Sequence, residues 1–275
     1  MNLREAIARL VEGHDLEEPE AEAAMGTIMA GEATPAQIGA FLVALRMKGE
    51  TPAEVAGCAR ALRRSALAVK ASTARPVLDT CGPGGDRSFT INISTAAAII
   101  AAAAGIPVAK HGNRSVSSRS GSADVLEALG VPLALTPEQA ARCLERAGIA
   151  FLFAPAFHPA MRHAQGPRRE LEIRTIFNLL GPLANPAGAP VQLLGVYHPS
   201  AVDLVAEALL RLGTQRALVV CGREGLDELS PAGPSVAAWV EPQGIRRFEV
   251  RPEDAGLDPA PLESIRGGSA QENAQ

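Results

Sequence analysis

The 275-residue sequence has few aromatic residues, no paired cysteines and no excess of positive charge. Aromatic side chains make up only 3% of the chain, which disfavours an aromatic-rich β-sandwich and leaves core packing to Ala, Leu and Val. The four cysteines are scattered without a CxxC pair, so they indicate neither a zinc site nor a disulfide framework. A net charge of −4 argues against a general nucleic-acid surface.

Long apolar runs are also absent. The N-terminus has no apolar signal region, and the Ala-rich run 96–104 is too short to cross a membrane. We therefore expect a soluble, cytoplasmic protein that binds neither nucleic acid nor membrane. Hydrophobic residues still make up 47% of the chain, which is enough for one large domain or for a large and a small one.

The first 70 residues predict helices only. Apolar residues recur at helical spacing from Leu3 onward, and Thr34-Pro35 and Thr51-Pro52 both carry the signal of a helix start. Glu54 adds a capping box to the second of these starts. We predict a small all-helical domain over residues 1–72.

Beyond residue 75, short apolar strands alternate with helices. The predicted strands are 77–79, 106–109, 149–153, 191–196 and 217–221, and the predicted helices are 94–104, 121–130, 137–148 and 201–212. A hairpin or edge pair is expected at 236–240 and 247–250. The alternation predicts an α/β domain over residues 73–275 with a mainly parallel central sheet.

Two glycine-bearing loops follow neighbouring strands. The first, residues 82–86, leads towards the helix that starts near residues 92–95, and the second begins at Lys110 and runs to Arg114. Each loop alone has a simple alternative, a tight turn or a solvated basic turn. Both start at the carboxyl edge of a parallel sheet, however, where ligands bind. Glycine backbone, a helix N-terminus and local cations together predict a ligand with several phosphates.

Carboxylates and arginines extend this site. Asp227 and Glu228 follow the strand at 217–221, and adjacent carboxylates facing a phosphate site favour Mg²⁺ over a plain surface dipeptide. Arginines at 162, 168 and 169 lie near an apolar segment, where a guanidinium can clamp a small carboxylate. For Arg162 and Arg169 we prefer a solvated helix face.

Several segments closely resemble anthranilate phosphoribosyltransferases. They are Asn-Ile-Ser-Thr at 92–95, Lys-His-Gly-Asn-Arg at 110–114, Ser-Gly-Ser-Ala-Asp at 120–124, the run Arg-Thr-Ile-Phe-Asn-Leu-Leu-Gly-Pro-Leu at 174–183, and Asp-Glu at 227–228. The resemblance covers nearly the whole chain. It implies transfer of the phosphoribosyl group of phosphoribosyl pyrophosphate (PRPP) to the amine of anthranilate, a step of tryptophan biosynthesis.

The resemblance also implies an architecture and an assembly. A small helical domain joins a larger α/β domain of the nucleoside phosphorylase and phosphoribosyltransferase kind, with part of 160–185 returning to the small domain. Family members usually form homodimers through the helical domains. They also usually continue beyond the segment at 267–274, so we expect the sequence to be a partial one.

Individual roles follow from the resemblance as well. The residues implied to line the PRPP site are Gly82, Gly85, Asp86, Thr90, Asn92, Ile93, Ser94, Thr95, Lys110, His111, Gly112, Asn113, Arg114, Ser117, Ser118 and Ser122. Those implied to bind anthranilate are Gly82, Asn113 and Arg168, with Arg168 on its carboxylate. Two Mg²⁺ ions per subunit are implied at Ser94, Asp227 and Glu228. No side chain is implied as a general acid or base.

His111 and His158 are placed by the resemblance at the anthranilate entrance, and a satisfied loop histidine is the alternative for each. Three residues depart from the family pattern: Pro83 replaces a Thr, and Arg87 and Glu172 replace glycines. Two rival functions stay open, a pyrimidine nucleoside phosphorylase and a non-catalytic phosphosugar-binding protein. A different aromatic acceptor also stays open.

Overall fold

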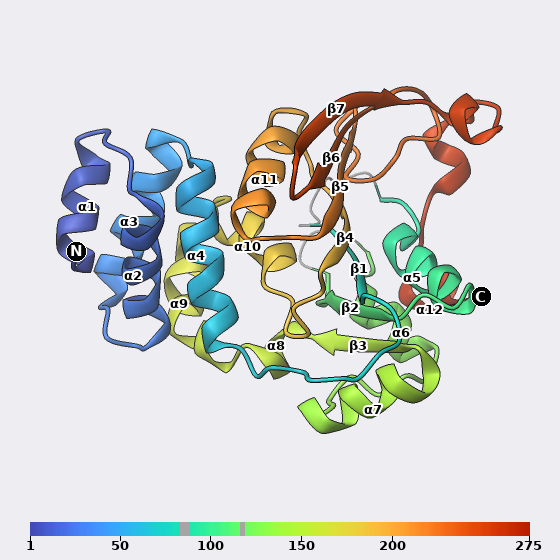
Figure 1. Ribbon diagram of the computed structural model, residues 1–275, viewed down its shortest axis with the longest axis horizontal. Helices are drawn as coiled ribbons and strands as arrows, with labels where there is room; N and C mark the ends of the chain where they lie inside the picture. Colours follow the sequence, from blue (N-terminus) through green and yellow to red (C-terminus); the bar gives the residue numbers. More distant parts are fainter. Residues whose placement is uncertain (83–88, 116–118) are drawn as a thin grey trace.

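The computed structural model describes residues 1–82, 89–115 and 119–275. The predictions for Gly85, Asp86, Ser117 and Ser118, and the departures at Pro83 and Arg87, fall outside the described residues. Figure 1 shows a molecule with a helical end that holds the N-terminus and a sheet-containing end that holds the C-terminus. No helix in the described ranges combines the length and the apolar character that a bilayer crossing requires.

The helical end is built from the first four helices. They are α1 (Leu3–Val11), α2 (Glu18–Met29), α3 (Pro35–Lys48) and α4 (Pro52–Ser65). Thr34 and Thr51 cap α3 and α4 with reciprocal capping boxes, which confirms both predicted starts. A later helix, α9 (Arg162–Leu171), packs against α3 and α2. The predicted domain limits at residues 72 and 73 stay a prediction.

A seven-stranded sheet forms the other end, in the order β3-β2-β1-β4-β5-β6-β7. Its strands are β1 (Leu78–Cys81), β2 (Val108–Gly112), β3 (Ile149–Phe153), β4 (Val191–Gly195), β5 (Arg216–Gly222), β6 (Ser235–Glu241) and β7 (Gly244–Val250). The first five strands pair in parallel, and β6 and β7 form an antiparallel hairpin on β5. The mainly parallel sheet and the hairpin are both confirmed.

The strand order creates a switch point between β1 and β4. The chain adds β2 and β3 on one side of β1 and then crosses to the other side for β4 and β5. Connections that leave β1 and β4 in opposite directions open a crevice at their carboxyl ends. Both predicted loops and the acidic pair follow strands at this edge, so the topology brings them together.

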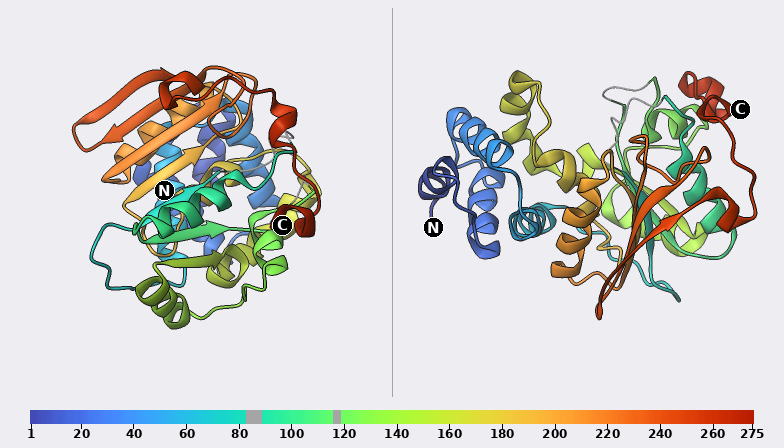
Figure 2. Two further views of the ribbon diagram at one scale, coloured as in Figure 1. Left: turned by 90° about the vertical axis from the view of Figure 1, so that its right-hand side faces the viewer. Right: turned by 90° about the horizontal axis from the view of Figure 1, so that it is seen from above.

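Helices cover both faces of the sheet, as Figures 1 and 2 show. Two of them lie between the sheet and the helical end, α10 (Phe177–Leu183) and α11 (Ser200–Arg211), and both contact α4. The helices on the other side are α5 (Ile93–Ala103), α6 (Ser122–Ala128) and α12 (Ala270–Ala274), while α7 (Pro137–Ala147) covers β3. Short connecting helices are α8 (Ala154–Phe157), η1 (Pro159–Met161), η2 (Pro252–Ala255) and η3 (Leu262–Ile265).

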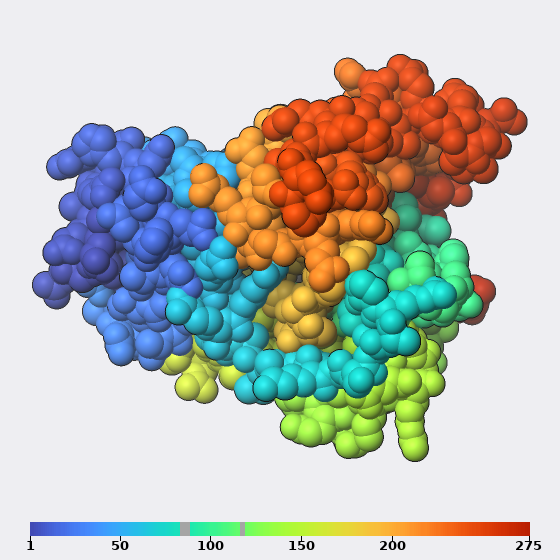
Figure 3. Space-filling model, in the orientation of Figure 1, coloured from blue at the N-terminus to red at the C-terminus, as the bar shows by residue number. Residues whose placement is uncertain are grey.

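The two ends share one apolar core. A single cluster of buried side chains runs from the bundle through α10 and α11 to β5 and β6. Arg63 Nε donates to the carbonyl of Leu183 at 2.6 Å, and Arg60 donates to the carbonyl of Arg211 at 2.6 Å. These bonds use carbonyls at the C-terminal ends of α10 and α11, where cations are favoured. In the space-filling view the bundle lies directly against the α11 segment (Figure 3).

The end of α9 carries backbone strain. Glu172 follows the last residue of α9 with φ 50° and ψ 22°, and it is exposed. A side chain in this left-handed region costs about 1 kcal/mol or more, whereas glycine adopts it freely. We expect Glu172→Gly to raise the free energy of unfolding by up to about 1 kcal/mol, because relief of strain exceeds the added freedom of the unfolded chain. Urea unfolding measures this, and a less stable variant would contradict it.

One local prediction was wrong. The sequence placed Lys110, His111 and Gly112 on a loop after a strand at 106–109, but β2 continues through all three of them. They pair in register with Phe151, Leu152 and Phe153 of β3. Polar side chains therefore lie inside the sheet, and the second loop is the connection from Asn113 to the start of α6 at Ser122.

Candidate active site

The acidic loop reaches the end of β1 at the switch point. A Cβ atom built on Gly82 would lie 3.1 Å from Oδ2 of Asp227, and one built on Gly195 would overlap the carbonyl oxygen of Asp227. Gly195 ends β4, and Gly82 directly follows β1. The absence of a side chain at both positions lets the carboxylate of Asp227 lie beside the start of the first loop. The predicted approach of these two segments is therefore present.

Lys110 is a buried cation beneath this crevice, with only 3% of its surface exposed. Its Nζ donates to the carbonyl of Thr80 at 2.5 Å and to Oγ of Ser94 at 3.1 Å. Burial lowers the pKa of Lys110, while the charges of Asp79 and Glu228 act in the opposite direction. The ammonium thus joins the end of β1 to the first turn of α5.

The acidic pair fits a hard divalent cation bound together with substrate. The carbonyl of Glu228 accepts the N–H of Gly222 at the end of β5 at 3.1 Å, and Lys110 holds Oγ of Ser94 near the end of β1, so both groups lie at the carboxyl edge of the sheet. In the described residues there is no cluster of three His, Cys, Asp or Glu side chains that could enclose a metal ion. A few carboxylate and hydroxyl oxygens completed by phosphate oxygens are what Mg²⁺ accepts. The donor set at Ser94, Asp227 and Glu228 fits that ion.

Asp79 organises the floor of the site, and the sequence analysis missed it. Its Oδ1 accepts the backbone N–H of His111 at 3.1 Å, and its Oδ2 accepts Nδ2 of Asn185 at 2.8 Å. Asn185 also donates to the carbonyl of Ala109 at 2.8 Å. Burial raises the pKa of Asp79 to about 6, although Asn185 and Lys110 oppose the shift. The only signal in the sequence was a charged residue within a short apolar strand.

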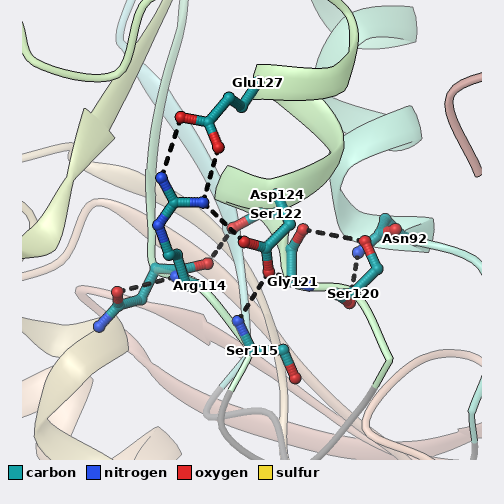
Figure 4. Close-up of polar contacts among 9 residues, drawn as sticks. Asn92, Arg114, Ser115, Ser120, Gly121, Ser122, Asp124 and Glu127 are labelled. Atoms are coloured by element: carbon teal, nitrogen blue, oxygen red, sulfur yellow. Dashed lines mark hydrogen bonds and ion pairs between the residues drawn. The ribbon is translucent and has the colours of Figure 1, made fainter. Parts of the chain in front are cut away.

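The second loop is tied at its base, as Figure 4 shows. Oδ2 of Asp124 accepts the backbone N–H groups of Ser115 at 3.0 Å and Gly121 at 2.9 Å. Arg114 donates to Oδ1 of Asp124 at 2.9 Å and to both carboxylate oxygens of Glu127. Ser122 Oγ donates to the carbonyl of Asn113 at 3.2 Å. The guanidinium of Arg114, predicted at the PRPP site, is thus engaged by α6, while its assignment to PRPP stays a prediction.

The residues at the start of α5 contact the segment before α6 and the C-terminal segment. Asn92 precedes α5 and donates Nδ2 to the carbonyl of Ser120 at 3.1 Å, and Ile93 is the first helical residue. Thr90 forms an isolated bridge with Arg266. Oγ1 of Thr95 is buried and makes no hydrogen bond to the described residues. Buried hydroxyls normally have partners, so Thr95 is suited to face a bound ligand.

Arg168 lies near the C-terminal end of α9, at the junction with the sheet domain. Its guanidinium carbon lies 4.8 Å from the centre of the Phe177 ring, and burial lowers its pKa. It forms no ion pair or hydrogen bond within the described ranges. Arg162 and Arg169 on the same helix are exposed, as predicted. The guanidinium of Arg168 is half-buried, is supported by a ring and has no carboxylate partner among the described residues. It is therefore suited to bind a small carboxylate.

The two predicted histidines meet in one buried pair. The ring centres of His111 and His158 lie 5.0 Å apart. Nδ1 of His111 lies 3.1 Å from the carbonyl oxygen of Gly181 and must donate, which leaves Nε2 as a buried acceptor without a partner in the described part of the chain. Burial lowers the pKa of His111 to about 3 and that of His158 to about 4. Both rings are therefore neutral at pH 7, and their place at the anthranilate entrance stays a prediction.

Because His158 is buried in its neutral form, we expect the folded state to lose stability in acid. Its pKa is lower in the folded than in the unfolded chain, so its contribution to stability is present above pH 6.5 and is lost as the pH falls towards 4. Asp79 has a raised pKa in the folded chain, so its contribution to stability increases as the pH falls below 6. The comparison with His158→Gln isolates the histidine. Between pH 6 and 4.5 we expect the variant to lose about 1.4 kcal/mol less per pH unit than the wild type.

Urea unfolding at several pH values measures this difference. His14→Gln is the matched control, because His14 lies exposed in the connection between α1 and α2. Equal slopes for the wild type and His158→Gln would contradict neutral burial of His158.

Comparison with known proteins decides the family. A helical bundle domain of the glycosyl transferase family matches residues 4–66, and the α/β domain of that family matches residues 74–275. Anthranilate phosphoribosyltransferase of Moorella thermoacetica is 57% identical over 273 residues, which cover 99% of this chain and 80% of the relative. The chain belongs to the anthranilate phosphoribosyltransferase family. The family expected from the sequence motifs is confirmed.

Solved relatives have the same fold. The crystal structure of the anthranilate phosphoribosyltransferase from Thermus thermophilus matches with a TM-score of 0.92 at 50% identity, covering 98% of this chain and 80% of the relative. The Saccharomyces cerevisiae enzyme in complex with PRPP and Mg matches with a TM-score of 0.90 at 28% identity, covering 99% of this chain and 78% of that one. Mg²⁺ is thus bound in a structure of the family.

Proposed function

We propose that this chain joins ribose 5-phosphate to the amine of anthranilate and releases pyrophosphate, in tryptophan biosynthesis. Family membership over nearly the full chain supports the activity. The observation that supports the site assignment is the approach of Asp227 to Gly82 at the switch point, next to Lys110, which holds the end of β1 and Oγ of Ser94. A polyanion at this edge would lie against backbone N–H groups on one side and against metal-bridged carboxylates on the other.

The chemistry requires little acid–base work from the protein. An aromatic amine is neutral at pH 7 and already nucleophilic, so the barrier lies in cleavage of the bond from C1 to the pyrophosphate oxygen. Negative charge develops on the leaving group, where Lys110 and the N-terminus of α5 would stabilise it. Mg²⁺ at Ser94, Asp227 and Glu228 would neutralise further charge on the pyrophosphate when bound.

Arg168 would hold the carboxylate of anthranilate. The neutral rings of His111 and His158 would line the acceptor entrance without adding charge. Orientation of the amine towards C1 would supply much of the remaining rate enhancement. The PRPP contacts of Gly85, Asp86, Ser117 and Ser118, and the anthranilate contacts of Gly82 and Asn113, belong to the same proposal.

Two finer points extend the proposal. We infer two Mg²⁺ ions per subunit, because Asp227 and Glu228 offer more oxygens than one substrate-bridged ion needs.

We also infer a cytoplasmic homodimer formed through the helical end, where Val11 and Met47 leave 72% and 82% of their surfaces exposed. A monomeric mass by light scattering would contradict the dimer.

The test is the loss of anthranilate fluorescence on addition of PRPP and Mg²⁺. We expect turnover with these substrates and none with pyrimidine nucleosides and phosphate. Tight PRPP binding without turnover would favour a non-catalytic binding protein. Turnover of nucleosides alone would identify a phosphorylase.

A further inference from the structure

Three segments that are distant in the sequence meet at the side chain of Asn92. Its Nδ2 donates to the carbonyl of Ser120 in the second loop at 3.1 Å, the contact drawn in Figure 4. Its Oδ1 accepts Nδ2 of Asn273, in the last turn of α12, at 2.9 Å. Asn92 itself directly precedes α5. One amide therefore joins the entry to α5, the end of the second loop and the C-terminal segment.

The backbone fixes the orientation of both amides. The N–H of Gly268 can only donate, and it donates to Oδ1 of Asn273 at 2.7 Å. The carbonyl of Ser120 can only accept, so Nδ2 of Asn92 must face it. Nδ2 of Asn273 therefore faces Oδ1 of Asn92, and neither amide can flip without losing a bond to the main chain.

The contact with Asn273 also changes what Asn92 does for α5. An asparagine before a helix normally accepts a hydrogen bond from an N–H group of the first turn. Among the described residues Asn92 makes no such bond, and its oxygen is instead directed at Asn273. The first-turn N–H groups of α5 stay uncapped by this side chain, which suits a helix whose N-terminus is to bind an anion.

The C-terminal segment 265–273 is held firmly beside Asn92. Gly267 donates to the carbonyl of Phe89 at 2.7 Å, and Ile91 donates to the carbonyl of Ile265 at 2.9 Å. A Cβ atom on Gly267 would overlap the carbonyl oxygen of Thr90, so this close approach requires glycine. The helix α12 packs against α6, next to the tied base of the second loop.

We propose that Asn273 is a positioning residue for PRPP binding. It holds Asn92 against the carbonyl of Ser120, which leaves the N-terminus of α5 available to the pyrophosphate. This inference rests on the proposed function, since it needs PRPP at the start of α5. Asn273 contacts the site only through Asn92 and does not touch the reacting atoms.

The test compares Asn273→Ala with Gln271→Ala, a truncation of an exposed residue in the same short helix. We expect the KM for PRPP to rise about 10-fold in Asn273→Ala, the effect of one hydrogen bond of ordinary strength. The KM for anthranilate should stay unchanged, and Gln271→Ala should match the wild type. Equal KM values for PRPP in the two variants would overturn the inference.

A double-mutant cycle separates positioning from a general loss of structure. If Asn273 acts through Asn92, Asn92→Ala/Asn273→Ala has the same KM for PRPP as Asn92→Ala alone. If the double variant instead shows the product of the two single increases in KM for PRPP, Asn273 acts elsewhere, and the inference is overturned.

Asn273→Asp provides a second arm if Asn273→Ala does not fold. It keeps an acceptor for Gly268 but turns an oxygen towards Oδ1 of Asn92, and Gln271→Glu controls for the added charge. A rise in the KM for PRPP beyond that of Gln271→Glu supports the inference, and an equal rise overturns it. If the wild type shows no turnover, the proposed function fails, and PRPP affinities from calorimetry replace the KM values in each comparison.

Discussion

Gly195→Ala should reduce turnover at least about 100-fold while the protein still folds. The new methyl group would overlap the carbonyl oxygen of Asp227. β4 is paired on both sides, with β1 and with β5, whereas Asp227 lies on a loop. The loop therefore moves rather than the strand, and the carboxylate leaves its place beside Gly82. Loss of one preorganised electrostatic element costs about 10²- to 10³-fold in turnover.

The anthranilate fluorescence assay measures this effect, and thermal unfolding measures the accompanying overpacking cost of about 1–3 kcal/mol. Gly39→Ala is the matched control. Gly39 lies inside α3 with open space where a Cβ atom would be added, so the variant should be active and at least as stable as the wild type. Wild-type turnover in Gly195→Ala would contradict the assignment of Asp227.

Arg168→Ala should raise the KM for anthranilate about 100-fold and leave the KM for PRPP nearly unchanged. Two charge-assisted hydrogen bonds to a carboxylate, at about 1.5 kcal/mol each, correspond to that factor. The guanidinium is already half-buried and supported by Phe177, so little ordering is required when the acceptor binds. Steady-state kinetics with each substrate varied in turn measures both constants.

Two neighbouring substitutions sharpen this prediction. Arg168→Lys keeps the charge but loses the planar fork, so its KM for anthranilate should fall between those of the wild type and Arg168→Ala. Arg169→Ala removes an exposed guanidinium from the same helix and should behave as the wild type. An equal rise of both KM values in Arg168→Ala would indicate a displaced α9 rather than a lost acceptor contact.

The sequence predicted the elements whose signals are local. The Thr-Pro pairs at 34–35 and 51–52 gave the correct starts of α3 and α4, because a capping box is complete within four residues. The alternation of apolar strands and helices likewise predicted the parallel sheet. Ligands bind at the carboxyl ends of parallel strands, and this rule also predicted correctly that the start of the first loop and Asp227 lie close together.

Roles that depend on strand register and on distant contacts could not be predicted. Lys110 looks like a loop residue because it is charged, yet it continues β2 and its ammonium is stabilised by a carbonyl and a hydroxyl from other elements. Asp79 and Asn273 find partners 106 and 181 positions away in the sequence. No local pattern encodes such pairings, and both residues were overlooked for that reason.

The central claim is that the acidic pair binds the PRPP polyanion through Mg²⁺, and calorimetric PRPP titrations with and without Mg²⁺ test it most directly. We predict that Mg²⁺ tightens PRPP binding to the wild type at least about 10-fold, equivalent to about 1.4 kcal/mol, and that Asp227→Asn abolishes this gain. If the pair bound no metal, removal of a negative charge beside a polyanion would instead strengthen PRPP binding. Tighter binding by Asp227→Asn, or an undiminished effect of Mg²⁺, would contradict the account.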